Sequence, residues 1–226
     1  MRIWEIDFLR GLAVLLMIAF HFIVDLHDFF AVPLDYQNGF FFLIGKLSAC
    51  LFIFIAGIST HFSRNPFRHG LHVLSWGLTI TVVTYFYEPT TYIRFGILHL
   101  LGSSLLFASF LRHYNVWQQS ILGFFILLLG NFWPGNNWLR QSWLLPLGYP
   151  PASFATLDYY PLLPWFGLFL LGMAGGSFFY PAHRSFFVQS PPDTPLHFLG
   201  RHALAIYLLH QPLLLVLLTC AFSLRQ

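Results

Sequence analysis

Long apolar runs separated by short polar breaks fill most of this chain. A helix that crosses the hydrocarbon core of a bilayer needs about 20 apolar residues, and runs of roughly that length recur from Phe8 onward. Breaks such as "NPFRHG" at 65–70, "YEPTT" at 87–91 and "SPPDTP" at 190–195 contain the glycine or proline residues that end helices. The pattern predicts seven membrane helices, at residues 8–30, 39–63, 70–88, 95–113, 116–134, 161–182 and 201–223.

The longest predicted connection runs from Gly135 to Tyr160, and "NWLRQSWLLPLG" within it, at 137–148, is a candidate interfacial helix. We find no sequence repeat and no separate soluble segment, so we expect a single transmembrane domain over residues 1–226. The N-terminus has no short apolar region that ends in a small-residue cleavage site, and the first helix is therefore expected to be retained.

Composition supports a membrane protein. Of 226 residues, 57% are hydrophobic and 8% are charged, whereas soluble domains carry about 25% charged residues. The fold class that follows is all-α, a polytopic bundle of about seven membrane helices. Trp4, Trp133 and Trp138 at segment ends suit an aromatic belt at the lipid–water boundary. Cys50 and Cys220 lie in apolar runs and are expected to be packing residues.

The arginines predict the orientation. With the N-terminus inside, seven arginines lie at cytoplasmic ends and three at outer ends, which agrees with the positive-inside rule. We therefore expect an integral protein of a bacterial cytoplasmic membrane with a cytoplasmic N-terminus. The cytoplasmic set is Arg2, Arg10, Arg64, Arg68, Arg112, Arg184 and Arg201, and the outer set is Arg94, Arg140 and Arg225.

The first helix carries a polar stripe within "DFLRGLAVLLMIAFHFIVDLHDFF", residues 7–30. Arg10 and His21 point within about 20° of each other on a helix, and His21 lies about 16 Å deeper. Asp25 follows His21 at the i,i+4 spacing that lets a carboxylate reach an imidazole. A charge at the bilayer centre costs about 3 kcal/mol, so these groups must face the bundle interior or a water-filled cavity. The stripe predicts that His21 is a general base oriented by Asp25; the alternative is a structural polar cluster that joins helices.

Five segments also resemble a known family. "LRGLAVLLMIAFHF" is similar to the Arg-x10-His motif of the membrane-bound acyltransferase-three family. The resemblance is closer to the catalytic-domain family of heparan-α-glucosaminide N-acetyltransferase, and it runs in order through "EIDFLRGLAVLLMIAFHFIVDL", "LFIFIAGIST", "RFGILHLLG", "YYPLLPWFGLFLLGM" and "LGRHALAIYLLHQPLL". It implies a multi-helix acetyltransferase that takes acetyl from cytoplasmic acetyl-CoA and passes it to an amine or hydroxyl, usually on a sugar. No metal is expected.

Two departures from the family limit what is carried over. The proposed catalytic histidine of the lysosomal enzymes lies in the lumenal loop after the Arg-Gly helix, but the corresponding loop here, "AVPLDYQN", has no histidine. The Arg-x10-His pattern favours His21 instead, with His27 a poorer candidate. The chain is also shorter than the lysosomal enzymes, so their substrate is not assumed.

Other charged residues suggest a donor site. Arg64 and Arg68 lie in the predicted cytoplasmic loop "SRNPFRHGLH", and together with Arg10 they are candidates to bind the phosphates of CoA. Positive-inside bias alone also explains this loop. His69 and His72 are weak candidates for a metal site because no carboxylate or cysteine completes the ligand set.

Further polar residues are candidates for the acceptor site or a polar cavity. Arg94 and His99 could bind an acceptor, or could be a topology-setting arginine and a packed histidine. Lys46 could snorkel to the surface or pair with Asp25 or Asp28 of the first helix. Tyr207 and His210, at i,i+3 on the last helix, could form a second wall of the cavity or make interhelical hydrogen bonds.

Two other functions compete with acetyl transfer. A proton-coupled transporter would also explain intramembrane Asp, His and Lys, but such transporters usually show inverted repeats with broken helices, and we find none in the sequence. A purely structural subunit leaves the aligned stripe unexplained. Acetyl transfer is therefore the leading interpretation. The expected partners are the bilayer, a sugar-like acceptor and, as a possibility, further copies of the chain; the scattered net charge of +3 does not suggest nucleic acid.

Overall fold

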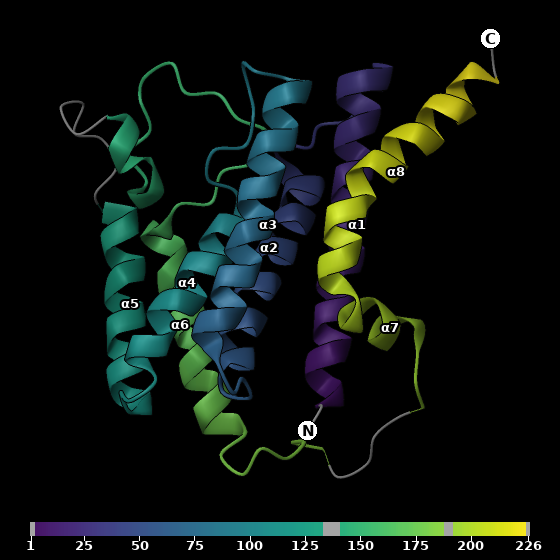
Figure 1. Ribbon diagram of the computed structural model, residues 1–226. Helices are drawn as coiled ribbons and strands as arrows, with labels where there is room; N and C mark the ends of the chain where they lie inside the picture. Colours follow the sequence, from purple (N-terminus) through teal and green to yellow (C-terminus); the bar gives the residue numbers. More distant parts are fainter. Residues whose placement is uncertain (1–2, 133–140, 188–191, 225–226) are drawn as a thin grey trace. The chain divides into compact units, whose positions relative to one another are not determined.

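The described structure is all-helical, as predicted. The computed structural model describes residues 3–132, 141–187 and 192–224 (Figure 1). Within these ranges there is no β-strand, and only an isolated bridge joins Phe95 to Tyr159. The elements are α1 (Trp4–Phe30), α2 (Gly39–Thr60), α3 (Pro66–Tyr87), α4 (Ile97–Leu111), α5 (Val116–Phe132), the 3₁₀ helix η2 (Ser142–Leu147), α6 (Leu162–Phe179), α7 (Pro195–Arg201) and α8 (Ala203–Ser223).

Each of the seven predicted ranges contains a helix, but several ends differ. The third helix begins four residues early because Asn65 caps it: the Asn65 side chain accepts a 3.0 Å hydrogen bond from the Arg68 amide, and Pro66 occupies the first turn. The last predicted helix, 201–223, agrees with α8, and the short helix α7, which was not predicted, precedes it and is separated from it at His202. The candidate interfacial helix is a 3₁₀ helix at Ser142–Leu147, and residues 137–140 lie outside the described ranges.

Helix length confirms a membrane protein. Four helices, α1, α2, α6 and α8, are long and apolar enough to cross a bilayer. Two shorter apolar helices, Ile97–Leu111 and Val116–Gly130, accompany them. The 15 residues of α4 span about 22 Å, less than the roughly 30 Å of hydrocarbon. Seven full crossings therefore stay a prediction.

The chain divides into two compact units, and the boundary falls within α2. Unit 1 comprises residues 1–52 and 184–226, and unit 2 comprises residues 53–183. In unit 1, α1 packs against α7 and α8. In unit 2, α3 packs on α4 and α5 packs on α6. Each unit is described separately below.

Glycines permit the closest helix contact of unit 1. A Cβ atom at Gly11 would overlap the carbonyl oxygen of Leu196, and one at Gly200 would overlap the carbonyl oxygen of Asp7. The backbones of α1 and α7 therefore touch, which is the packing that small residues allow between membrane helices. This contact fixes the start of α1 against the short helix that precedes α8.

We predict that Gly200→Ala destabilises the protein by at least about 2 kcal/mol, because the new methyl group overlaps backbone that cannot rotate away. Gly175→Ala is the matched control, since a Cβ there meets only the side chains of Phe54 and Phe179, at ordinary distances of 3.5 Å or more. Thermal unfolding of both variants in detergent tests this. Equal melting temperatures for the two variants would contradict the α1–α7 contact.

Candidate functional site

Arg10 links α1 to α7 in unit 1. Its guanidinium donates a 3.1 Å hydrogen bond to Asp7 and a 3.5 Å bond to the carbonyl oxygen of Gly200. The Asp7 ion pair is half-buried, with 27% of the Arg10 side chain and 13% of the Asp7 side chain exposed. Arg10 therefore stabilises the α1–α7 contact as well as being a candidate phosphate ligand.

The neighbouring cation of α7 is also paired. Arg201 forms a bidentate ion pair with the exposed Asp193, at 2.8 and 2.6 Å. The hydrogen bonds from Arg201 lower the pKa of Asp193, and the same pair raises the pKa of Arg201. Such fork-shaped pairing is the strongest geometry between a guanidinium and a carboxylate. Arg10 and Arg201 therefore each already hold a carboxylate.

His21 is positioned by its own helix. Its Nδ1 atom lies 3.0 Å from the Met17 carbonyl oxygen, one turn earlier on α1. A carbonyl can only accept, so Nδ1 carries the proton in this hydrogen bond. In the neutral ring, Nε2 then has a free lone pair, which is the form a general base or nucleophile requires. The i−4 carbonyl thus selects the tautomer that the predicted role of His21 needs.

His210 on α8 lies against His21. The two rings meet edge to face, with centroids 4.9 Å apart. The Nδ1 atom of His210 lies 2.6 Å from the Tyr207 carbonyl oxygen, which fixes the same tautomer as in His21. Its Nε2 atom is buried and has no hydrogen-bond partner among the described residues. Helices α1 and α8 therefore bring two imidazoles of the same tautomer together.

Asp25 is fully buried and is held by α8. Its exposed fraction is 0%, and its Oδ1 atom accepts a 2.6 Å hydrogen bond from Gln211. The described contacts show no hydrogen bond between Asp25 and His21, although the two are one turn apart on α1. Gln211 was not singled out from the sequence, where its only signal is its place beside His210 in "LLHQP". The interaction that holds Asp25 is thus with Gln211.

These four side chains form what we call the α1–α8 polar cluster: His21, Asp25, His210 and Gln211. Three of its buried atoms have no hydrogen-bond partner among the described residues, namely Asp25 Oδ2, His210 Nε2 and Gln211 Oε1. With Asp25 ionised and His210 in the tautomer derived above, all three accept hydrogen bonds and none donates. Buried polar atoms are normally paired. The cluster is therefore complementary to a group that supplies several N–H or O–H donors.

Lys46 and Tyr207 both belong to unit 1, but in the described contacts only Tyr207 reaches the residues around His21. Lys46 is exposed, with its ammonium 5.6 Å from the centroid of the Phe42 ring. The ion pairs among the described residues include neither of the pairings considered for it, with Asp25 or with Asp28, and Asp28 lies beside His27 instead. Tyr207 supplies the carbonyl that orients His210, and the two rings are 5.7 Å apart. Of the predicted cavity residues, His210 therefore lies beside the stripe residue His21, and Tyr207 lies beside His210.

Arg94 and His99 lie in unit 2, at the start of α4. Arg94 lies over the rings of Tyr92 and Phe154, at 4.8 and 5.3 Å. His99 Nδ1 accepts a 3.2 Å hydrogen bond from the Gly96 amide, so in the neutral ring its proton is on Nε2, 3.1 Å from Thr81 Oγ1. Both nitrogens of His99 are therefore satisfied within unit 2, the pattern of a structural histidine.

Arg64 and Arg68 are exposed residues of unit 2, at the connection between α2 and α3. The described structure gives neither guanidinium an acidic partner. Arg64 lies on the connection itself and Arg68 in the first turn of α3, and two such exposed cations can bind phosphate groups. No group of three or more His, Cys, Asp or Glu side chains in the described ranges could hold a metal ion.

Comparison with known proteins adds one finding. A family model described as "Heparan-alpha-glucosaminide N-acetyltransferase, catalytic" matches residues 2–212. This confirms the resemblance drawn from the five sequence segments. No curated protein and no solved structure shows a significant match.

We predict that Gln211→Leu destabilises the protein by about 1–3 kcal/mol, because it leaves the buried Asp25 carboxyl without its donor. Thermal or denaturant unfolding in detergent measures this. Thr219→Val, at an exposed position of the same helix, is the control and should change stability by less than about 0.5 kcal/mol. If Gln211→Leu behaved like Thr219→Val, Gln211 would not be the group that holds Asp25.

Proposed function

Since the chain belongs to the heparan-α-glucosaminide N-acetyltransferase catalytic family, we propose that it transfers acetyl from cytoplasmic acetyl-CoA to an amine or hydroxyl of a sugar-like acceptor. Membership makes it part of a transferase family, and its apolar helices make it an integral membrane protein. The observation that carries the finer proposal is the α1–α8 polar cluster. Its buried atoms lack donors, and amines and hydroxyls are donors.

His21 is the proposed catalytic residue. In direct transfer, its Nε2 takes the proton of the acceptor N–H or O–H while the acceptor atom attacks the thioester carbonyl carbon. The C–S bond then breaks, and the CoA thiolate leaves and receives a proton. In the alternative, Nε2 attacks the carbonyl itself, the C–S bond breaks, and the acetyl group passes from the imidazole to the acceptor. Both routes need the Nε2 lone pair that the Met17 carbonyl selects.

Asp25 is proposed to support His21 electrostatically. It lies one turn away on α1, and its charge stabilises the imidazolium that forms when His21 takes a proton. Gln211 holds the Asp25 carboxyl from α8 and lies next to His210 in the chain. Asp25 and Gln211 are therefore positioning residues in this scheme, whereas His21 contacts the reacting atoms.

The donor is proposed to bind at the cytoplasmic side, with phosphate groups near Arg10, Arg64 and Arg68. A polyanion such as CoA needs several cations, and guanidinium groups bind phosphate with two parallel hydrogen bonds. The arginine distribution supports this side, because by the positive-inside rule it predicts a cytoplasmic N-terminus. The acceptor then approaches His21 from the outer side of a bacterial cytoplasmic membrane.

We predict that His21→Ala lowers acetyl transfer by about 10²–10⁴-fold, the usual contribution of a well-placed general base. Purified protein is given acetyl-CoA and glucosamine or related amino sugars, and the acetylated product is measured by mass spectrometry. Asp25→Asn should lose less, because the imidazole remains.

His27→Ala is the matched control on the same helix. His27 is exposed and lies beside Asp28 and Tyr36 rather than in the cluster, so its removal should leave turnover within about twofold. A folded His21→Ala protein that transfers acetyl at the wild-type rate would exclude this mechanism.

We predict that the double variant Arg64→Gln/Arg68→Gln weakens CoA binding by at least about tenfold, since two charge-assisted hydrogen bonds are lost. Calorimetric titration with CoA measures this. Arg140→Gln, predicted to lie on the opposite side of the membrane, is the control. Equal losses in the two proteins would argue against a donor site at residues 64–68.

A further inference from the structure

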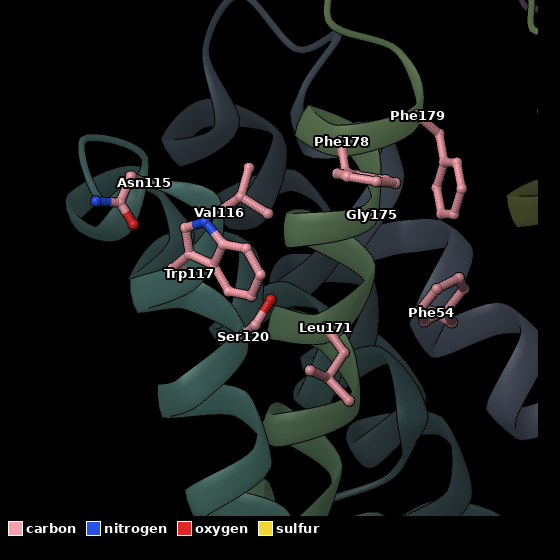
Figure 2. Close-up of a pocket in the computed structure, with 9 residues that line it drawn as sticks. All are labelled: Phe54, Asn115, Val116, Trp117, Ser120, Leu171, Gly175, Phe178 and Phe179. Atoms are coloured by element: carbon pink, nitrogen blue, oxygen red, sulfur yellow. The ribbon is translucent and has the colours of Figure 1, made fainter.

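Unit 2 contains an apolar cavity that the proposed chemistry does not use. Its volume is about 570 Å³, within the range of roughly 300–1,000 Å³ that small-molecule sites occupy. The cavity lies among the end of α6, the start of α5 and α2. Figure 2 shows Trp117 and Ser120 extending from α5 towards α6, whose last turns carry Leu171, Gly175 and Phe178.

Gly175 borders open space where neighbouring glycines do not. A Cβ at Gly172 would overlap the Phe54 carbonyl, and one at Gly176 would come within 2.8 Å of the Ile58 carbonyl. A Cβ at Gly175 would meet only side-chain atoms, at 3.5 Å or more. Gly172 and Gly176 thus serve close helix packing, whereas Gly175 leaves room in the cavity that a larger side chain would fill.

The rim of the cavity is aromatic and exposed. Trp117, Phe178 and Phe179 are 77%, 67% and 50% exposed. Contiguous apolar surface of this kind marks a site for a membrane or another apolar partner. A tryptophan at the first turn of a membrane helix is also typical of the headgroup level. The rim therefore suits the boundary between hydrocarbon and headgroups.

The end of unit 2 that holds this rim is basic. In Figure 1, α2 and α6 finish and α5 begins at the same end of unit 2. Arg112 and His113 are exposed in the turn just before the cavity residues Asn115 and Trp117, and Arg64 and Arg68 follow α2. The acidic residues of the described part of unit 2, Glu88 and Asp158, are at the other end, at the end of α3 and at the start of α4.

An apolar cavity that opens at a cationic end matches a ligand with an apolar chain and an anionic head. We propose that an anionic phospholipid of the surrounding bilayer occupies this cavity, with an acyl chain against Leu171 and Phe54 and its phosphate at Arg112. CoA is a poor fit here, because its adenine and pantetheine amides would lie against phenyl rings without hydrogen-bond partners. This lipid site is independent of acetyl transfer.

Fluorescence quenching by brominated lipids tests the proposal. The intact protein is reconstituted with dibrominated phosphatidylglycerol or dibrominated phosphatidylcholine at matched mole fractions. The Trp117 signal is the difference between wild type and Trp117→Phe. Quenching titrations should give an association constant for the anionic lipid about fivefold higher, the preference expected from one nearby cation.

Five variants locate the site. Arg112→Gln should bring the two lipids to equal association, whereas Arg140→Gln should keep the fivefold preference. Gly175→Leu fills the cavity and should remove the preference, and Gly175→Ala should retain it. Ser120→Phe fills the cavity from α5 and should also remove the preference, so it replaces Gly175→Leu if that variant fails to fold.

Three outcomes would overturn the proposal. Equal quenching of wild-type Trp117 by both lipids would show that the site has no preference for an anionic headgroup. An unchanged preference in a folded cavity-filling variant would place lipid binding elsewhere on the surface. Protection of Trp117 from both lipids would show that protein, such as a second copy of the chain, covers the rim.

Discussion

A fully buried carboxyl group in a membrane helix constrains the arrangement of unit 1. Asp25 has no exposed surface, and the bilayer offers it no donors, so a neighbouring helix must supply one. Gln211 supplies it, and the 2.6 Å bond fixes the height and rotation of α8 against α1. The edge-to-face contact of His21 and His210 follows from the same alignment, since His210 precedes Gln211 in the chain.

A second contact, between α1 and α7, fixes the other end of α1. Gly11 and Gly200 let the backbones of α1 and α7 touch, and Arg10 bonds to the Gly200 carbonyl from the same turn of α1. Arg10 and His21 are eleven residues apart, or about 16 Å along the helix. The charged end of α1 and the buried cluster are thus held by separate contacts on one rigid element. Such an element suits a reaction in which donor and acceptor meet at a fixed place.

The sequence predicted the helices and the stripe for related reasons. Apolar runs between glycine and proline breaks determine where membrane helices can form, and helical periodicity determines that Arg10, His21 and Asp25 share a face. Gln211 could not be predicted in the same way, because one amide in an apolar helix has no periodic signal and its partner is 186 residues away. The short helix α7 was not predicted, because its 7 residues directly after the proline-rich break at 190–195 are too few to show a helical period. The pairing of Lys46 with Asp25 or Asp28 is absent from the ion pairs of the described residues for a related reason. The sequence pattern predicts which helix a side chain is on and how deep it lies, but not which neighbouring side chain it contacts.

The histidines also show why residue type alone does not identify a base. His99 and His197 lie in the first turns of α4 and α7, where free backbone amides donate to Nδ1 from Gly96 and Thr194. In the neutral ring their proton must then be on Nε2, which makes that atom a donor. His21 and His210 lie in helix interiors, where the preceding turn offers carbonyl oxygens instead, at Met17 and Tyr207. Their proton is on Nδ1 and their Nε2 atoms have lone pairs. The position of a histidine within its helix thus decides its tautomer, and this favours His21 over His99 as the base.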